Sequence, residues 1–471
     1  MRKTKIICTI GPASTDEEVL RGMCKAGMNV ARLNFSHGTH EEQEVKVNHI
    51  KKVREELGLP IAIMLDTKGP EYRIRTFKNG KVTIEDGAEF TFTTREVEGD
   101  EHMVSVSYAG LAQEMNPGDR VLVNNGLLIF EVVSTTDTDV ICKTIAGGVM
   151  SDRKSMSFPN KVLKQAYLSE QDKQDMLFGI KHGVDFFACS FVSCRQDLLD
   201  VQEFLNANGG EDIELIAKIE NQAGIDNIEE ICQSCGGIMI GRGDMGVEIP
   251  FEDLPAVQKK LITKCRLMGK RVITATEMLE SMISNPRPTR AEISDVANAV
   301  YDGTSAIMLS GETAAGKYPV LTVETMSRIA EKTEQSISYD NRFRNSNTFR
   351  IKNTTDAISH ATCGMAIDIG ADAIAVCTMS GRTARMVSRF RPPVDIVGMT
   401  TNECSWRKLA LSWGVVPAMS EVYDSTDVMF FAAKKMTCQC LGLKEGDKIV
   451  ITGGQSYGFK SSTNLIKIET I

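Results

Sequence analysis

Residues 213–244 read IELIAKIENQAGIDNIEEICQSCGGIMIGRGD, and this stretch holds the pattern that decides the fold. It contains two apolar runs, Glu214–Ala217 and Gly237–Ile240, which have the length of buried strands. Charged residues follow each run. Lys218 and Glu220 are two positions apart, so in a strand their side chains point the same way. An ammonium and a carboxylate on one face can also form a purely structural ion pair. The pattern elsewhere in the chain must therefore decide whether the pair is structural or functional.

The same pattern of a short apolar run with helical segments between recurs along the chain. Helical segments of this kind include Glu17–Ala26, Glu41–Leu57 and Asp197–Asn208. Eight strands that alternate with helices predict a closed parallel (β/α)8 TIM barrel. The eight runs are Lys5–Ile10, Asn29–Phe35, Ile61–Leu65, Val184–Ala188, Glu214–Ala217, Gly237–Ile240, Arg271–Ala275 and Ser305–Leu309.

Polar residues stand in or directly after most of these runs. In a barrel of this kind the C-terminal ends of the strands meet at one face, where active sites lie. Glu220 and Asp244 then offer two carboxylates from adjacent strand ends, a set that suits Mg²⁺ or Mn²⁺ with water and substrate as further ligands. The strand-end residues are Thr9, Arg32, Asn34, Ser36, Asp66, Thr67, Ser190, Lys218, Glu220, Arg242, Asp244, Thr276, Ser310 and Glu312.

Two further domains are expected. A β-rich insert follows the third strand, with turn signals such as Asn124-Asn125-Gly126, and predicts a small β-barrel lid over the reactive face. After a polar linker at Tyr339–Asn353 and a helix capped by Thr354 or Thr355, alternating strands predict an open α/β sheet. The expected ranges are 1–69 and 168–340 for the barrel, 70–167 for the lid and 341–471 for the C-terminal domain.

Composition excludes several classes of function. The net charge of −8 argues against a nucleic-acid partner, and no apolar run approaches the ~20 residues that span a membrane. Thirteen cysteines without a framework spacing indicate reduced thiols and a cytoplasmic protein. Cys232 and Cys235 form a lone CxxC without a second ligand pair at suitable spacing, so we expect them to be structural.

Longer motifs carry a family resemblance. The segments at 3–14 (KTKIICTIGPAS), 27–38 (GMNVARLNFSHG), 65–71 (LDTKGPE), 237–250 (GIMIGRGDMGVEIP) and 285–319 resemble pyruvate kinases, as does essentially the whole chain. The resemblance implies transfer of the phosphoryl group of phosphoenolpyruvate to ADP, the final step of glycolysis. It also implies Mg²⁺ (or Mn²⁺) and K⁺ as cofactors and a homotetramer in the cytoplasm.

The resemblance assigns roles to matching positions. It implies catalysis by Lys218, Arg32 and Thr276, with Gly243 and Asp244 also binding substrate. Glu220 and Asp244 would hold the divalent ion. The implied nucleotide contacts are Asn34, His37, Arg73 and Lys154, and the implied K⁺ ligands are Asn34, Ser36, Asp66 and Thr67.

Some positions depart from the family pattern. Glu71 stands where K⁺-independent members carry a lysine, which predicts K⁺ activation because either a lysine or a bound cation must offset phosphate charge. Asn124 and Asn125 replace two aspartates of the lid. Ser193, Ala223 and Glu277 stand where the family commonly has Arg, Glu and Gln. None of these changes removes a catalytic residue named above.

A second phosphate site is expected in the C-terminal domain. Hydroxyls, a glycine and an arginine at the start of a helix favour an anion, and the family binds a sugar-phosphate activator with this loop. The residues are Thr378, Ser380, Gly381, Arg382 and Thr383. In the facing loop, Ser461 takes the place of a usual glycine, so the activator could be fructose 1,6-bisphosphate, a sugar monophosphate or nothing.

Two rival functions remain open from the sequence. A barrel lyase that acts on phosphoenolpyruvate or pyruvate through a metal enolate would share Glu220 and Asp244 but would lack the lid and the ADP contacts. A paralogue that senses sugar phosphates without turnover would keep the fold and lose ATP formation.

Overall fold

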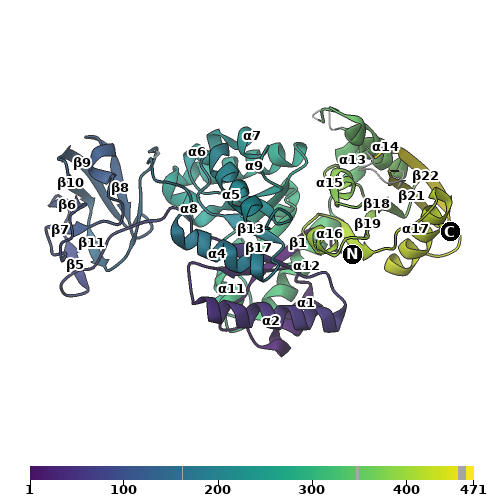
Figure 1. Cartoon of the computed structure of the whole chain (residues 1–471), viewed down its shortest axis with the longest axis horizontal. Helices are drawn as coiled ribbons and strands as arrows, with labels where there is room; N and C mark the ends of the chain where they lie inside the picture. Colours follow the sequence, from purple (N-terminus) through teal and green to yellow (C-terminus); the bar gives the residue numbers. More distant parts are fainter. Residues whose placement is uncertain (162, 346–348, 455–462) are drawn as a thin grey trace.

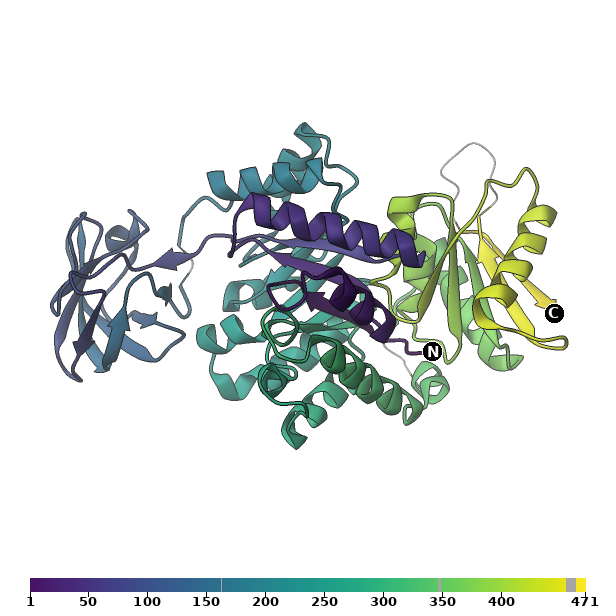
Figure 2. The same ribbon diagram turned by 90° about the horizontal axis from the view of Figure 1, so that it is seen from below.

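The computed structural model describes residues 1–161, 163–345, 349–454 and 463–471. Its three domains lie in a row, with the β-rich lid at one end, the barrel in the middle and the C-terminal domain at the other end (Figure 1). Figure 2 shows the same order from below, with the N-terminus beside the C-terminal domain. The Met1 ammonium lies 3.7 Å from Asp395 of that domain.

The predicted eight-stranded parallel barrel is confirmed. It closes in the order β1-β17-β16-β15-β14-β13-β3-β2. All strand residues except Asn34 and Glu214 are buried, because helices cover the outside of the barrel and side chains fill its inside. Most of these strand residues are apolar for that reason. The strands are β1 (Lys5–Thr9), β2 (Val30–Asn34), β3 (Ala62–Asp66), β13 (Phe186–Cys189), β14 (Glu214–Ile219), β15 (Gly237–Gly241), β16 (Arg271–Ala275) and β17 (Ala306–Leu309).

The barrel helices begin at strong caps. Thr39, Ser169 and Thr289 each form a capping box with an acidic residue three positions later. The helices are α1 (Glu17–Ala26), α2 (His40–Leu57), α4 (Glu170–Lys181), α5 (Arg195–Ala207), α6 (Gln222–Asp226), α7 (Ile228–Ile231), α8 (Arg242–Glu248), α9 (Leu254–Leu267), α10 (Arg290–Asp302), α11 (Gly311–Ala314) and α12 (Pro319–Gln335), with 3₁₀ turns at Phe251–Asp253 and Glu280–Ile283.

The lid is a β domain with its own core, built around Phe90, Phe92 and Phe130. Its main sheet has the order β4-β12-β8-β9-β10-β6-β7, and β5 pairs with β11 in a second sheet. The elements are β4 (Tyr72–Arg73), β5 (Lys81–Ile84), β6 (Glu89–Thr93), β7 (Met103–Ser105), α3 (Leu111–Glu114), β8 (Arg120–Val123), β9 (Leu128–Thr135), β10 (Asp139–Ala146), β11 (Gly148–Ser151) and β12 (Ser155–Ser157).

The C-terminal domain has a sheet of order β20-β19-β18-β21-β22, in which only β22 runs antiparallel. The predicted linker is wrong for Tyr339–Arg344, which form a helix because Tyr339 and Phe343 pack into the core. Asn353, and not a threonine, caps the next helix. The elements are α13 (Tyr339–Arg344), α14 (Thr354–Asp368), β18 (Ala373–Cys377), α15 (Arg382–Ser388), β19 (Asp395–Thr400), α16 (Glu403–Leu409), β20 (Val415–Met419), α17 (Thr426–Leu441), β21 (Lys448–Gly453) and β22 (Leu465–Thr470).

The C-terminal domain docks on the N-terminal ends of the barrel strands. Glu214, the first residue of β14, pairs with Arg271 of β16 at 2.9 Å and with Arg385 of α15. Arg407 of α16 donates a 2.8 Å hydrogen bond to Asp185 beside β13. The opposite, C-terminal ends of the strands therefore remain available for a site. Among the described helices, none is both long and apolar enough to cross a membrane.

Lys5 at this docked end supports a test of stability against pH. Its Nζ donates a 2.7 Å hydrogen bond to the carbonyl of Val415, and burial, with repulsion from Arg2, lowers its pKa from 10.5 to about 7. The folded protein therefore binds fewer protons than the unfolded chain between these values, so this lysine penalises folding below about pH 7 and the penalty fades as the pH rises. Lys5→Met should therefore gain stability relative to the wild type at low pH.

The measurement is the thermal midpoint of both proteins from about pH 6 to about pH 10. The thermal midpoint of Lys5→Met should fall relative to that of the wild type as the pH rises. A difference that stays constant over this range would contradict a depressed pKa at Lys5.

Candidate active site

Four charged side chains from three barrel strands form one buried network. Lys218 of β14 places its Nζ 3.0 Å from Asp66 Oδ1 and 3.2 Å from Glu220 Oε1. Arg32 of β2 donates from Nε to Asp66 Oδ2 at 2.6 Å. Burial alone would lower the pKa of Lys218, but Asp66 and Glu220 outweigh it and raise that pKa. The ammonium is thus fixed in its charged form at the end of the strand.

Hydroxyl groups extend this network to neighbouring strands. Lys218 donates to Ser190 Oγ at 2.6 Å, and Ser190 donates to the carbonyl of Thr67 at 2.7 Å. Arg32 donates from Nη1 to Thr9 Oγ1 at 2.9 Å. Side chains that are far apart in sequence therefore meet at the C-terminal rim, as the strand-end pattern predicted. Ser190 stood in that pattern without an assigned role, and the structure makes it a positioning residue for Lys218.

Glu220 and Asp244 form a carboxylate pair beside Lys218. Burial, together with the nearby Asp244 charge, raises the pKa of Glu220 to about 7 against the effect of Lys218. Burial also raises the pKa of Asp244, which is hydrogen-bonded to Glu220. Although Asp244 is more exposed than Glu220, two carboxyl groups in contact disfavour double ionisation unless a cation lies between them. The pair therefore has the chemistry of a divalent-cation site.

The backbone makes room for this pair. A Cβ atom added at Gly241 would lie 2.6 Å from Glu220 Oε1, so a side chain there would displace the carboxylate. The Phe191 amide, at a φ of +56°, donates to Glu220 Oε2 at 2.9 Å and fixes its second oxygen. Within the described ranges, no cluster of three or more His, Cys, Asp or Glu side chains is suited to a metal. Two protein carboxylates fit Mg²⁺, which keeps water and substrate oxygens as further ligands.

Thr276 lies across from this pair in a strained conformation. Its φ is +68°, which is rare for a β-branched residue and is typical of functional sites. Thr276 Oγ1 accepts a 2.9 Å hydrogen bond from the Gly243 amide and donates to the Ala275 carbonyl at 2.6 Å. Arg242 supports the same turn through hydrogen bonds to the Thr276 carbonyl. The hydroxyl is thereby held beside the first turn of α8.

The four expected K⁺ ligands lie at or directly after the ends of two adjacent strands, β2 and β3. Asp66 is buried and engaged by Arg32 and Lys218, while Asn34 Oδ1 accepts from the Ser36 amide at 3.1 Å. Thr67 Oγ1 accepts from the Ser190 amide at 3.3 Å. All four residues offer oxygen atoms, and their parent strands β2 and β3 pair directly. Oxygen atoms are the donors that a hard cation prefers, so the four residues are suited to a monovalent cation such as K⁺.

The expected nucleotide residues come from the rim and the lid hinge. Arg73 of β4 pairs with both oxygens of Glu71 at 2.8 Å, and it also donates to the Arg153 carbonyl. Lys154 precedes β12, the strand that pairs with β4. Asn34 ends β2 and the exposed His37 follows it on the barrel side. The structure therefore sets these residues on both sides of the lid–barrel junction.

Comparison with known proteins decides the family. The model "Pyruvate kinase, barrel domain" matches residues 1–323, and "Pyruvate kinase, alpha/beta domain" matches residues 356–469. The chain belongs to the pyruvate kinase family. It is 43% identical over 472 residues to the pyruvate kinase of Clostridium acetobutylicum, with full coverage of both chains. It is also 43% identical to that of Geobacillus stearothermophilus, covering 100% of this chain and 80% of the relative.

A solved structure shares the whole architecture. The crystal structure of a pyruvate kinase from Cryptosporidium parvum matches with a TM-score of 0.95 at 36% identity, covering 100% of this chain and 96% of the other. The order of barrel, lid insert and C-terminal α/β domain is therefore that of a pyruvate kinase throughout.

Three of the departures from the pyruvate kinase pattern line one cleft. Asn125 of the lid and Ser193 and Ala223 of the barrel border a cavity of about 220 Å³ that also reaches Asp244. Asn124 and Asn125 both have positive φ, so asparagine suits the tight turn that carries them. Ser193 accepts a 3.0 Å hydrogen bond from Asn221. These three positions contribute small neutral groups to a cavity that Glu71, Lys161 and Glu248 also line.

Glu248 at the end of α8 is a site residue that the sequence reasoning missed. Burial raises its pKa to about 7, and it accepts hydrogen bonds from Ser157 and the Phe158 amide of the lid. Its only signal in the sequence was its place in the GRGDMGVEIP motif. Glu248 thereby connects α8, which also carries Asp244, to the lid.

The expected effector loop lies at the start of α15. Gly381 caps the helix with a φ of +74°, and Thr383 Oγ1 lies 2.6 Å from Thr463 Oγ1 of the facing loop. Ser461, expected to shape that loop, lies outside the described residues. The CxxC cysteines are both buried, and Cys232 Sγ lies 3.5 Å from Cys265 Sγ in the barrel wall.

Proposed function

We propose that this protein transfers the phosphoryl group of phosphoenolpyruvate to ADP, forming pyruvate and ATP in the final step of glycolysis. The observation that carries the proposal is the network of Lys218, Arg32 and Asp66 beside the Glu220–Asp244 pair. It brings positive charge and a divalent-cation site to one rim in a chain whose net charge is −8. Phosphoryl transfer depends mainly on such positioning and charge stabilisation.

Lys218 and Arg32 hold the phosphoryl group in this proposal. Lys218 neutralises the charge that spreads over the equatorial oxygens during transfer, and Arg32 orients the group toward ADP. Asp66 holds the Arg32 guanidinium and the Lys218 ammonium in place, because each of its two oxygens accepts a hydrogen bond from one of them. The lid excludes water, which would otherwise hydrolyse the phosphoryl group.

The first turn of α8 and Thr276 hold the other end of the substrate. The amide of Asp244 lies at a helix N-terminus, where backbone N–H groups favour a carboxylate. Gly243, whose own amide donates to Thr276 Oγ1, adds no side chain to this turn, so the substrate can approach its backbone. Thr276 holds a proton at Oγ1 beside this turn and helps deliver a proton to the enol carbon through water. Asn34, His37, Arg73 and Lys154 contact the nucleotide.

Glu220 and Asp244 would hold Mg²⁺ (or Mn²⁺), which supplies positive charge to the oxygens of phosphate and enolate when bound. Asn34, Ser36, Asp66 and Thr67 would hold K⁺.

Replacing K⁺ by a tetraalkylammonium salt at equal ionic strength should lower kcat about tenfold or more. Glu71 cannot replace the missing cation, because it is an anion whose carboxylate already pairs with Arg73. Steady-state rates in both salts measure the effect. Unchanged turnover in the tetraalkylammonium salt would contradict the K⁺ site.

Glu71→Lys provides the matched variant, since an ammonium at this position can offset phosphate charge. Its rate should depend less on K⁺ than the wild-type rate does. Equal K⁺ dependence in both proteins would place the ion elsewhere.

One coupled assay separates the proposal from its rivals. Pyruvate formation that requires ADP and yields one ATP per pyruvate supports phosphoryl transfer. Pyruvate or enolate chemistry without ADP would indicate a lyase. Thermal shifts with sugar phosphates but no ATP formation would indicate a sensing paralogue.

We also propose that Thr378, Ser380, Gly381, Arg382 and Thr383 bind a sugar-phosphate activator in a homotetramer. Hydroxyls and a guanidinium at the start of α15 support this. Initial rates against phosphoenolpyruvate with a panel of sugar phosphates test it, and sedimentation tests the tetramer. Identical saturation curves with every compound would rule out activation.

A further inference from the structure

Two segments of the chain join the lid to the barrel (Figure 2). The outgoing segment leaves β3 and passes Gly69 before β4 begins, and the returning segment leaves β12 and passes Tyr167 before α4 begins. Both segments contact Ser190, which directly follows β13 at the C-terminal rim of the barrel. The two connections of the lid therefore meet the barrel at the same residue.

Tyr167 holds the returning segment through its hydroxyl group. The hydroxyl donates a 2.7 Å hydrogen bond to the carbonyl of Ser190. Tyr167 is only 8% exposed, and its ring packs into the core of the barrel. Burial raises the pKa of Tyr167 well above its usual value, so the hydroxyl keeps the proton that it donates. The side chain is thus held by packing along its ring and by a directional bond at its tip.

Gly69 brings the outgoing segment against the same residue. Its φ is +69°, and a Cβ atom at this position would lie 2.8 Å from the Ser190 carbonyl oxygen, so a larger residue would displace Ser190. The Gly69 amide donates a 3.1 Å hydrogen bond to Oδ1 of the buried Asp172. The other carboxylate oxygen of Asp172 accepts from the hydroxyl of Ser169, the cap of α4, at 2.6 Å. Asp172 therefore ties the outgoing segment to the end of the returning one.

Ser190 connects this junction to the Lys218 ammonium. Its hydroxyl accepts from Lys218 Nζ at 2.6 Å and donates to the Thr67 carbonyl at 2.7 Å, and its amide donates to Thr67 Oγ1 at 3.3 Å. Ser190 is only 2% exposed, and closely packed interiors transmit a displacement instead of absorbing it. A shift of the Ser190 carbonyl, which Tyr167 holds, must therefore also move the hydroxyl that holds Lys218.

Packing alone does not explain the hydroxyl of Tyr167. A phenylalanine would fill the same space without needing an acceptor, whereas a buried tyrosine hydroxyl requires one. The acceptor here is the backbone of the residue whose side chain contacts the catalytic lysine. The hydroxyl of Tyr167 therefore has a place in the site that its ring does not have.

We propose that Tyr167 is a positioning residue that couples the lid to the Lys218 ammonium through Ser190. Strand β14 fixes the backbone of Lys218, and Ser190 decides where its Nζ atom points. Because Tyr167 holds Ser190 to the returning segment, closure of the lid and placement of the ammonium occur together, so phosphoryl transfer begins when water is excluded. The inference rests on the proposed phosphoryl transfer and adds to it a residue that touches neither substrate nor metal.

Tyr167→Phe removes the hydroxyl and keeps the ring. We expect kcat for ATP formation to fall about tenfold, the effect of one lost buried hydrogen bond on the transition state. The KM for phosphoenolpyruvate should change less than about twofold, because an interaction made mainly in the transition state lowers kcat without weakening substrate binding. Tyr339→Phe is the matched control. Tyr339 is also 8% exposed, but it lies on α13 at the docked end, so its variant should keep kcat within about twofold.

A double-mutant cycle tests the route through Ser190. Ser190→Ala removes the hydroxyl that contacts Lys218, so Tyr167→Phe should lower kcat less than about twofold further in that background. Full additivity of the two substitutions in ln kcat would show that Tyr167 acts independently of Ser190 and would overturn the proposal. An unchanged kcat in Tyr167→Phe, or equal losses in Tyr167→Phe and Tyr339→Phe, would overturn it as well.

Hydrogen exchange on the ligand-free protein tests the same link without turnover. The amides of residues 67–71 and 186–192 should exchange at least about threefold faster in Tyr167→Phe than in the wild type, and Tyr339→Phe should leave them unchanged. Faster exchange in Tyr167→Phe, in a protein that forms no ATP, would contradict the proposed function and support the link. Equal exchange in a wild type and a Tyr167→Phe protein that both form ATP would overturn the link alone.

Discussion

Lys218→Met should lower kcat about 10³-fold, the loss typical of removing one positioned charge from a transition state. Lys218 is the cation that contacts Asp66, Glu220 and Ser190 at once. Methionine keeps the length and most of the volume of the side chain. Initial rates of ATP formation at saturating phosphoenolpyruvate and ADP measure the effect.

Stability must be measured beside activity for this variant. Loss of the ammonium leaves Asp66 and Glu220 less compensated, which costs about 3–5 kcal/mol for a buried pair. Lys5→Met is the matched control, since it removes another buried barrel lysine at the opposite, docked end. It should keep kcat within about twofold. Full ATP synthesis by a folded Lys218→Met protein would contradict the proposed charge neutralisation.

Glu220→Gln should weaken divalent-cation binding about 100-fold and lower kcat at fixed Mg²⁺ by a similar factor. The substitution keeps shape but removes one of the two carboxylates of the pair. Titration with Mn²⁺, followed by its paramagnetic signal, measures binding without turnover. High Mg²⁺ should recover part of the lost rate, because the remaining Asp244 still supplies one ligand.

Glu248→Gln is the control for the loss of a buried carboxylate that is not a proposed metal ligand. Glu248 also has a pKa of about 7, but its partners are Ser157 and the Phe158 amide of the lid. Its neutral variant should bind Mn²⁺ within about twofold of the wild type. Equal losses in Glu220→Gln and Glu248→Gln would show that the Glu220–Asp244 pair is not the metal site.

The barrel could be predicted from sequence because its strands are short, apolar and regularly spaced. Every predicted run overlaps an observed barrel strand, and all limits but two agree to within one residue. The edges of the C-terminal sheet were harder. Strand β20 (Val415–Met419) carries Pro417 within its apolar run, and the half-exposed β22 (Leu465–Thr470) mixes apolar with charged residues, so both strands were missed. Helix α13 was missed because its few core residues stand among polar ones.

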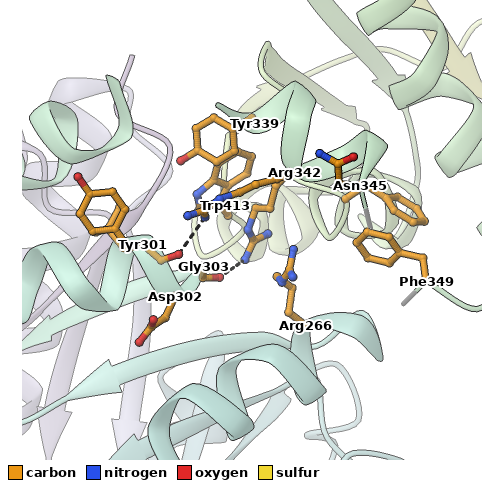
Figure 3. A pocket seen from close by; sticks show the side chains of 12 residues that line it. Arg266, Tyr301, Asp302, Gly303, Tyr339, Arg342, Asn345, Phe349 and Trp413 are labelled. Carbon is orange, nitrogen blue, oxygen red and sulfur yellow. Dashed lines mark hydrogen bonds between the residues drawn. The ribbon is translucent and has the colours of Figure 1, made fainter. Parts of the chain in front are cut away.

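Convergence of the site residues could also be predicted, because strand ends must meet in a closed barrel. Their exact contacts could not. The positive φ of Thr276 and the hydrogen bond from Gly243 depend on how two loops pack. The cavity that Arg266, Arg342 and Arg391 border between the barrel and the C-terminal domain (Figure 3) could not be found from sequence either, because these arginines have no motif and are gathered only by docking of the domains.

Strand β14 spans the whole barrel wall between the two functional ends of the molecule. It begins at Glu214, which Arg385 of α15 holds, and it carries Lys218 four residues later. Hydrogen bonds to β13 and β15 keep it stiff on both sides. The same hydrogen bonds oppose sliding of β14 past its neighbours, so the strand holds Lys218 at a fixed height above the docked domain. One strand of the barrel thus carries both an anchor for the C-terminal domain and the buried ammonium of the rim.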